Sequence, residues 1–131
     1  MRILLDTSYL YTLIDAPGAL SAAERLILSN PDVTLFISAV SIWEMRLKFA
    51  ARHRSGARKS ALDPTAVLGL LEEQDVTFLP MTVAHAAARL ETPLKHKDPF
   101  DEMLLLQAQA EGLRLMTVDR QLAKHPLAVE A

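Results

Sequence analysis

Short runs of apolar, often β-branched residues alternate along this chain with longer segments of helical periodicity. The runs at Ile3 to Leu5, Val33 to Ser38, Val76 to Leu79 and Arg114 to Val118 are expected to be strands. They are apolar almost continuously rather than at every second residue, as expected when both faces of a sheet are covered. The pattern therefore predicts an α/β fold, a three-layer α/β/α sandwich with a mainly parallel sheet.

The segments between these runs carry the apolar spacing typical of helices. Helices are expected at Ser8 to Ile14, Leu20 to Ser29, Val40 to His53, Pro64 to Glu73, Val83 to Glu91 and Pro99 to Glu111. A short helix near Gln121 and a terminal strand at Leu127 to Val129 are also predicted, and Gly112 is expected to end the helix before the last clear strand. Because the 131 residues contain no repeat or linker, we expect one domain, residues 1–131.

Composition narrows the class of protein. With 50% hydrophobic and 23% charged residues, a chain of this length can bury a core, which excludes disordered and fibrous classes. The absence of cysteine excludes a disulfide framework, a thiolate nucleophile and a cysteine-based zinc site. The longest stretch without Asp, Glu, Lys or Arg, Val76 to Ala88, is too short to span a bilayer, and the first residues lack the pattern of a secretory signal. We expect a soluble, cytoplasmic protein with no membrane partner.

Positive charge is concentrated in one segment although the net charge is -2. No acidic residue occurs between Met45 and Leu62, where six of the 14 basic residues lie: Arg46, Lys48, Arg52, Arg54, Arg58 and Lys59. A solvated helix face followed by a basic loop explains this cluster. A surface that holds a polyanion is the alternative, and it needs support from elsewhere in the chain.

Four acidic residues fall at ends of the predicted elements. Asp6 follows the first strand, Asp119 follows the last clear strand, and Glu44 and Asp101 lie near the starts of helices. In open α/β sheets the ligand crevice lies beyond the carboxyl ends of the strands, where the strand order reverses. We therefore expect these four carboxylates at one edge of the sheet.

Each acid also has a purely structural explanation. Asp6 and Asp119 stand where a side chain would cap the following helix. Asp98 precedes a proline at the first helical position and is a natural N-cap, and Asp101 falls where a capping box places its acid. For Asp98 we prefer the cap.

Glu44 has the spacing of an i, i+4 ion pair with Lys48, which is worth only a few tenths of a kcal/mol. It also lies close to the apolar face carried by Val40, Trp43 and Leu47. Because that face is apolar, a solvent-exposed ion pair is less suited to the position of Glu44.

Several carboxylates within mutual reach raise one another's pKa and are unfavourable unless a cation lies among them. A set of ligands made only of oxygen atoms suits Mg²⁺ or Mn²⁺. Such ions hold phosphates and activate water, which is the chemistry of phosphodiester hydrolysis. The basic segment after Glu44 would then hold a polyanionic backbone beside the metal.

The sequence resembles the PIN-domain ribonucleases, and among them the VapC-type toxins of toxin-antitoxin pairs. The resemblance rests on four motifs in order along nearly the whole chain: Asp6-Thr7-Ser8, Ser41-Ile42-Trp43-Glu44 with Lys48 one turn on, His96-Lys97-Asp98-Pro99-Phe100-Asp101 and Thr117-Val118-Asp119. It implies a single PIN domain, an endoribonuclease dependent on Mg²⁺ or Mn²⁺, a homodimer, and a small antitoxin that blocks the site.

The resemblance also implies roles for particular residues. The family's acids correspond to Asp6, Glu44, Asp101 and Asp119, with Lys48 beside them and Thr7, Ser8 or Thr117 as hydroxyl partners of the site. An antitoxin is expected to insert an arginine among the acids and to cover the apolar faces at Ser8 to Ile14 and Val40 to Leu47.

Two features depart from the family pattern. Glu102 follows Asp101 where the family often has arginine, and the tail from Lys124 to Ala131 lacks an aromatic ending. Neither departure removes an acid.

Other classes of protein fit less well. A receiver domain needs adjacent acids where Asp6-Thr7 stands, and a haloacid-dehalogenase-type phosphatase needs a second aspartate where Ser8 stands. No glycine-rich phosphate loop or serine elbow is present. A PIN-like domain that binds RNA or protein without cleaving remains the alternative.

The four histidines, His53, His85, His96 and His125, show no metal-ligand spacing to one another. His85 is expected to cap or pack against a helix, and the other three are expected to be solvated.

Overall fold

The structure is a computed structural model that describes residues 1–51, 55–57 and 62–129. Its elements are β1 (Arg2–Leu5), α1 (Thr7–Asp15), the 3₁₀ turn η1 (Pro17–Ala19), α2 (Ala22–Ser29), β2 (Thr34–Ser38), α3 (Ala39–Ala50), α4 (Pro64–Glu72), β3 (Val76–Leu79), α5 (Val83–Ala87), α6 (Pro99–Glu111), β4 (Arg114–Met116) and the 3₁₀ turn η2 (Leu122–Lys124). Most of the bounds lie within two residues of the predicted ones.

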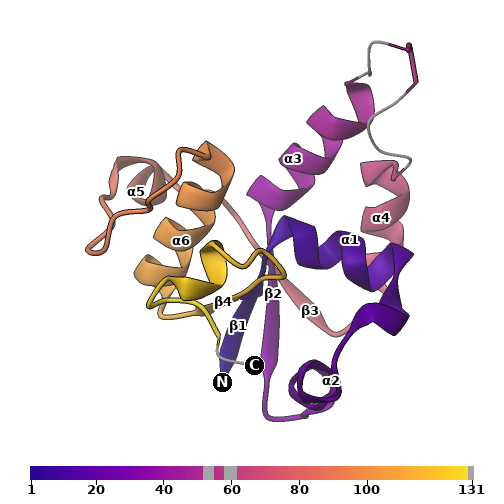
Figure 1. Ribbon diagram of the computed structural model, residues 1–131, viewed down its shortest axis with the longest axis horizontal. Helices are drawn as coiled ribbons and strands as arrows, with labels where there is room; N and C mark the ends of the chain where they lie inside the picture. The colour runs from indigo at the N-terminus through magenta and orange to yellow at the C-terminus, as the bar shows by residue number, and fades with distance from the viewer. Residues whose placement is uncertain (52–54, 58–61, 130–131) are drawn as a thin grey trace.

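The four strands form one parallel sheet in the order β3-β2-β1-β4. The chain moves from β1 outward to β2 and β3, and then returns to place β4 on the other side of β1. The strand order therefore reverses between β1 and β4, and the crevice expected beyond the strand ends lies there. Figure 1 shows α1 leaving from the end of β1 that is opposite the N-terminus.

Helices cover both faces of the sheet, which confirms the predicted three-layer α/β/α sandwich. Alternate residues of β1 point to opposite faces. Leu4 packs in a core with Leu104 of α6, whereas Ile3 packs in a second core with Leu10 of α1 and Val67 of α4. Figure 1 accordingly shows α5 and α6 on one side of the sheet and α1, α2 and α4 on the other.

The start and end of α6 follow from its sequence. Asp98 Oδ1 accepts hydrogen bonds from the backbone N–H groups of Phe100 (2.9 Å) and Asp101 (3.2 Å), and Pro99 occupies the first turn. The preferred cap at Asp98 is therefore confirmed. Gly112 ends the helix with a φ of 67°, a left-handed conformation that favours glycine.

Two predicted elements are shorter in the structure. The predicted strand from Arg114 to Val118 ends at Met116, because the next side chain, Thr117, turns to a carboxylate beside β1. The terminal strand predicted at Leu127 to Val129 is reduced to one bridge between Ala128 and Leu115.

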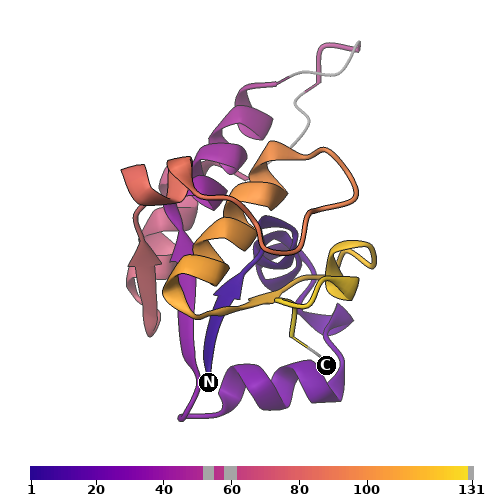
Figure 2. The ribbon, with the colours of Figure 1, turned by 90° about the vertical axis from the view of Figure 1, so that its left-hand side faces the viewer.

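The predicted helix from Val83 to Glu91 ends at Ala87. The residues beyond it bond to a side chain of α6 instead. Gln109 Nε2 donates to the carbonyl oxygen of Arg89, and the N–H of Glu91 donates to Gln109 Oε1, both at 2.9 Å. The backbone after α5 therefore has partners outside a helix. Figure 2 shows this segment crossing in front of α6.

Part of the predicted basic segment lies outside the described residues. These are Arg52, Arg54, Arg58 and Lys59, together with His53 at the predicted end of the third helix. Arg46 and Lys48 lie on α3, where both are solvent-exposed. Among the described residues, every helix is too short or too polar to cross a membrane.

Candidate metal centre

Asp6 lies at the end of β1, where the strand order reverses. Its N–H donates to the carbonyl oxygen of Met116 at 2.9 Å, so the backbone is fixed to β4. Its carboxylate Oδ2 accepts hydrogen bonds from Ser8 Oγ (2.7 Å) and Thr117 Oγ1 (2.5 Å). The interpretation of Asp6 as a helix cap is wrong, because its side chain accepts no bond from the backbone of α1. The two hydroxyls instead orient this buried carboxylate.

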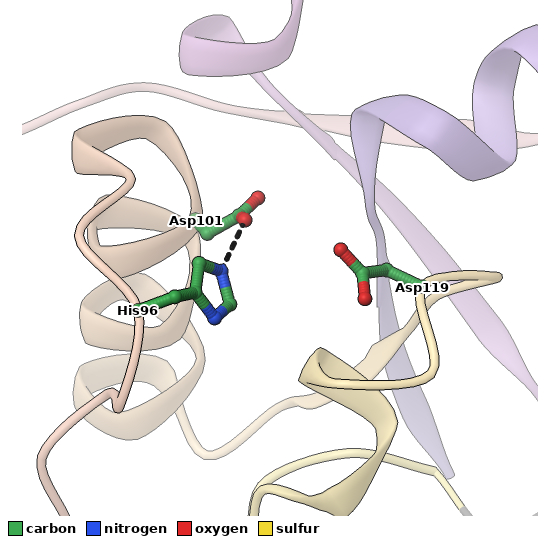
Figure 3. Close-up of side chains that lie close together, drawn as sticks. All are labelled: His96, Asp101 and Asp119. Carbon is green, nitrogen blue, oxygen red and sulfur yellow. Dashed lines mark hydrogen bonds and ion pairs between the residues drawn. The ribbon is translucent and has the colours of Figure 1, made fainter.

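Asp101 lies in the first turn of α6, where Asp98 already caps the helix. Its carboxylate is therefore available for another partner, and its Oδ2 lies 2.9 Å from His96 Nε2. The capping-box role considered for Asp101 is wrong, since its side chain bonds to His96 rather than to the Asp98 backbone. Figure 3 shows the His96 ring turned toward Asp101.

Asp119 follows β4 and lies across from Asp101. Its N–H donates to Thr117 Oγ1 at 3.0 Å, so Thr117 connects the Asp119 backbone with the Asp6 carboxylate. Asp119 Oδ1 accepts hydrogen bonds from the N–H groups of Gln121 (2.8 Å) and Leu122 (3.4 Å). Asp119 therefore bonds backbone N–H groups at the start of this turn, as the cap interpretation expects, although the N-cap position of the 3₁₀ turn η2 is Gln121.

Among the described residues, His96, Asp101 and Asp119 form the group whose candidate ligand atoms all lie within 4.8 Å of one another. Figure 3 shows His96 and Asp101 facing Asp119 from opposite sides, the first two from the α6 side and the third from the loop after β4. Asp6 is not in this group, but its charge acts on Asp101. Three of the four predicted acids therefore lie at the same edge.

Negative charge at this edge shifts the pKa values of both Asp101 and His96. Burial, together with the negative charges of Asp6 and Asp98, raises the pKa of Asp101 to about 6, although the hydrogen bond with His96 opposes the shift. The same hydrogen bond raises the pKa of His96, and the charges of Asp101, Asp119 and Asp98 add to the effect. A positive charge is favoured at this position.

Glu44, the fourth predicted acid, has a different partner. It is buried on α3, and its Oε2 lies 3.1 Å from Lys48 Nζ, so the i, i+4 ion pair predicted from the spacing is confirmed. Lys48 Nζ also lies 5.4 Å from the centre of the Tyr11 ring. Burial lowers the pKa of Lys48, but the hydrogen bond and charge of Glu44, with Tyr11 and Asp98, raise it overall. Within the described part of the chain, no hydrogen bond or ion pair joins Glu44 to the other three acids.

Thr7 of the first motif and Glu102, which departs from the family pattern, also have structural contacts. Thr7 Oγ1 donates to Ser41 Oγ at 2.9 Å in a buried contact that joins the starts of α1 and α3. The Glu102 side chain lines a small hollow with Arg89 and Leu94. Both contacts lie outside the group of His96, Asp101 and Asp119.

Sequence reasoning missed the contribution of the histidines. His96 is half-buried against Asp101 rather than solvated, and His125 Nε2 lies 2.8 Å from the Thr92 carbonyl oxygen. The spacing of His96, five residues before Asp101 and just ahead of the helix cap, was a usable signal. The expectation for His85 is confirmed, because it is buried and forms a capping box with Thr82.

The donor atoms fit a divalent cation. Carboxylate oxygens suit Mg²⁺ and Mn²⁺, and an imidazole nitrogen is a common ligand of transition metals. The three candidate ligand residues converge, and the charges of Asp6 and Asp98 make the ionised form of Asp101 less favourable. The group includes a nitrogen donor, so it differs from the all-oxygen site predicted.

Known proteins share the fold of this chain. Residues 3–126 match the PIN domain family. The structure is similar to the crystal structure of VapBC2 from Rickettsia felis bound to a DNA fragment from their promoter, with a TM-score of 0.68, 18% identity, and coverage of 98% of this chain and 96% of that chain. It is also similar to VapC20 of Mycobacterium tuberculosis, a sarcin-ricin loop cleaving toxin, with a TM-score of 0.55, 17% identity and 92% of each chain covered. No curated protein matches the chain in sequence.

Proposed function

The chain belongs to the PIN domain family, and from this premise we propose that residues 1–131 act as one PIN domain, a metal-dependent endoribonuclease that is the toxin of a toxin-antitoxin pair. The observation that carries the proposal is the convergence of carboxylates at the reversal of strand order, where burial and neighbouring acids raise the pKa of Asp101 to about 6. Both similar structures come from VapC-type systems, and one of those proteins cleaves the sarcin-ricin loop.

The proposed metal ligands are the carboxylates of Asp6, Asp101 and Asp119, which lie at the same edge of the sheet, together with Glu44, which would have to exchange its ion pair with Lys48 for the metal. When bound, Mg²⁺ or Mn²⁺ supplies positive charge for phosphate oxygens and a water molecule of lowered pKa. The side chains of Ser8 and Thr117 hold the Asp6 carboxylate in one orientation through their hydroxyls.

Two basic side chains have supporting roles in this proposal. His96 donates to Asp101 and fixes the direction of its carboxylate. The ammonium of Lys48 balances the charge of buried Glu44. The Thr7 hydroxyl joins the start of α1, which follows Asp6, to the start of α3, which carries Glu44. Each of these groups prepares the carboxylates for binding.

The proposed protein partner is a small antitoxin. An open apolar groove of about 570 Å³ lies between α3, α4 and β3, and its lining includes Ile42, Trp43, Leu68 and Phe78. Trp43 is 47% exposed although it is the largest apolar side chain of the molecule. This groove includes part of the Val40 to Leu47 face, which we propose as the antitoxin surface.

The other expected antitoxin surface is less suitable. Tyr9 and Leu10 on α1 are fully buried, and Leu13 and Ile14 pack against the same core. The apolar face of α1 is therefore largely used by the fold, and we assign it no antitoxin contact. A homodimer and action on cytoplasmic RNA complete the proposal.

The nuclease activity is tested with purified protein and a mixed pool of RNA in Mg²⁺, in Mn²⁺ and in EDTA. We expect cleavage with a divalent ion and none in EDTA, and no cleavage by Asp6→Asn. An RNA-binding protein that never cuts would reveal the non-catalytic alternative.

The toxin role is tested separately in cells. Expression of the protein alone should arrest growth, and co-expression of the neighbouring gene should relieve the arrest, with the two proteins purifying together. Normal growth of cells that contain active protein would overturn the toxin role and leave the nuclease role intact.

A further inference from the structure

A second cavity begins beside the candidate metal centre. It has a volume of about 400 Å³ and is lined by residues 92–96, by Gln121 and Lys124, and by His125 and Pro126. This volume lies within the range of about 300–1,000 Å³ that is typical of small-ligand pockets. His96 belongs both to this lining and to the group with Asp101 and Asp119, so the cavity adjoins the carboxylates directly.

The two walls of the cavity are joined by hydrogen bonds. The Leu127 N–H donates to His125 Nδ1 at 3.2 Å, which leaves the hydrogen of the neutral ring on Nε2. His125 Nε2 then donates to the Thr92 carbonyl oxygen at 2.8 Å. Arg114 donates to the Pro126 carbonyl oxygen and supports the same wall. These bonds hold the cavity open between the segment before α6 and the turn after β4.

The charge of the cavity is opposite to that of the metal centre. Its described lining contains Lys95 and Lys124 together with two histidines, and it contains no aspartate or glutamate. The neighbouring centre offers carboxylates from Asp101 and Asp119. An anionic ligand that extends from the metal centre into the cavity would therefore contact the candidate metal-binding groups at one end and the lysine ammonium groups at the other.

A nucleic-acid strand suits this arrangement of protein charges, because each phosphate is followed by another along the backbone. A phosphate held at the metal centre is neutralised there, whereas the next one requires cations from the protein. The cavity also presents the apolar side chains of Pro93, Leu94 and Pro126, which suit the face of a base.

We propose that this cavity holds the RNA nucleotide next to the scissile phosphate, with Lys95 and Lys124 at its phosphate group. The inference rests on the proposed nuclease function and names the part of the substrate that this chain grips beside its metal centre. An acidic segment of a protein partner is the competing ligand for the same lysines.

The test compares two double variants that remove the same charge from the same two segments. Lys95→Gln with Lys124→Gln removes the lysines that line the cavity. Lys97→Gln with Arg120→Gln removes exposed cations that lie next to them in sequence but do not line it. Equal melting temperatures of the two variants would show that both keep the fold.

Binding is measured by fluorescence anisotropy with a labelled single-stranded RNA of mixed sequence in EDTA, over a range of salt concentrations. We expect the cavity variant to bind about tenfold more weakly, and the slope of log K against log salt to fall by about 1.4, or about 0.7 for each phosphate contact on a single strand. The control variant should stay within about twofold of wild type, since it removes charges that do not line the cavity. Cleavage of an RNA that the wild type cuts should show a higher KM in the cavity variant with little change in kcat.

The outcomes separate this inference from the function on which it rests. Equal weakening in both variants means a general effect of charge and overturns the cavity assignment. If the cavity variant binds and cuts RNA like wild type but loses affinity for the co-expressed partner protein, the cavity is a partner site. If wild type neither binds nor cuts RNA, the proposed nuclease function fails first and the inference fails with it.

Discussion

Glu24 at the corner of α1 and α2 and Asp101 at the carboxyl end of the sheet are both partly buried carboxylates, but their surroundings differ. Glu24 Oε2 accepts a hydrogen bond from Tyr9 Oη at 2.5 Å, and its Oε1 accepts one from the Ser21 N–H at 3.1 Å. The bond from Tyr9 lowers the pKa of Glu24, with Ser21 assisting and burial opposing. Burial and the charges of Asp6 and Asp98 raise the pKa of Asp101.

The two regions differ in whether the protein itself supplies partners for the ionised carboxylate. At the corner each oxygen of Glu24 has a donor, so the ionised form stabilises the fold. At the sheet edge Asp101 faces other carboxylates, and His96 opposes only part of their effect. The edge therefore keeps an electrostatic penalty that a bound cation would remove, as expected of a site built for function rather than for stability.

The largest expected effect is the loss of cleavage when the edge loses an acid. Asp6→Asn or Asp101→Asn should reduce the cleavage rate by at least about 10²-fold, the range seen when one group that stabilises transition-state charge is removed. The fold should stay intact or become slightly more stable, because each change removes a repelling charge. The rate of RNA cleavage and the melting temperature are the two measurements.

Asp98→Asn is the matched control for these variants, because it changes an acid of the same helix start. Asn caps a helix about as well as Asp, so its cleavage rate should be close to wild type. Equal losses at Asp98 and Asp101 would mean that the two roles are wrongly assigned.

The second expected effect is that a divalent ion bound at the carboxylate edge of the sheet stabilises the folded protein. A divalent ion at a concentration of about 100 times its Kd should add about 2.7 kcal/mol to the free energy of unfolding, since it binds the folded state. For a chain of this size that is a rise of about 10 °C in melting temperature. Titrations with Mg²⁺ and Mn²⁺, followed by thermal unfolding, measure the rise.

The comparison predicts that the rise in melting temperature with metal depends on the sheet edge and not on the corner that carries Glu24. Asp101→Asn should lose most of the rise, whereas Glu24→Gln should keep it in full. An unchanged melting temperature in both metals would remove the basis for a metal centre.

The sequence predicts most of the fold because the apolar residues of β1, β2 and β4 are largely buried. Short continuous apolar runs such as Ile3 to Leu5 are typical of buried strands. Because β1 and β4 are neighbours in the sheet, the ends of these strands bring Asp6 and Asp119 to the same edge. The cap at Asp98 was predictable because the proline beside it fixes the start of α6.

Contacts that depend on the path of a loop were not predictable from periodicity. His96 reaches Asp101 because the segment before α6 is held by Gln109 on one side and His125 on the other. Those bonds join residues far apart in sequence, and no local pattern reports them. In contrast, the ion pair of Glu44 with Lys48 joins residues four positions apart on one helix, and this local spacing predicted it correctly.

The third effect is a loss of stability at the corner. Glu24→Gln should lower the free energy of unfolding by about 1 kcal/mol, because it weakens a charge-assisted hydrogen bond in a partly exposed pair. Tyr9→Phe removes the other half of the bond and keeps the buried ring. Urea unfolding of the two single variants and the double variant measures the coupling. Additive losses would mean that the bond contributes nothing of its own.

The smallest effect is a pH dependence of opposite sign in the two regions, measured as melting temperature in EDTA. Because the pKa of Glu24 is lowered by folding, its contribution is present above its unfolded value of 4.5 and is lost as the pH falls through the folded value. Asp101 does the reverse. Between its unfolded value of 3.8 and its folded pKa of about 6 the folded protein retains a proton that the unfolded chain releases, so stability falls as the pH rises.

Single variants should separate these two contributions. Glu24→Gln should flatten the acid side of the curve, and Asp101→Asn should flatten the decline between 3.8 and about 6. His96 extends the decline, because its raised pKa makes a contribution that is full below 6.5 and disappears at higher pH. A curve for Asp101→Asn that runs parallel to wild type would show that the edge carries no electrostatic penalty. The two carboxylates would then be alike, and the contrast between a region built for stability and one built to bind a cation would no longer hold.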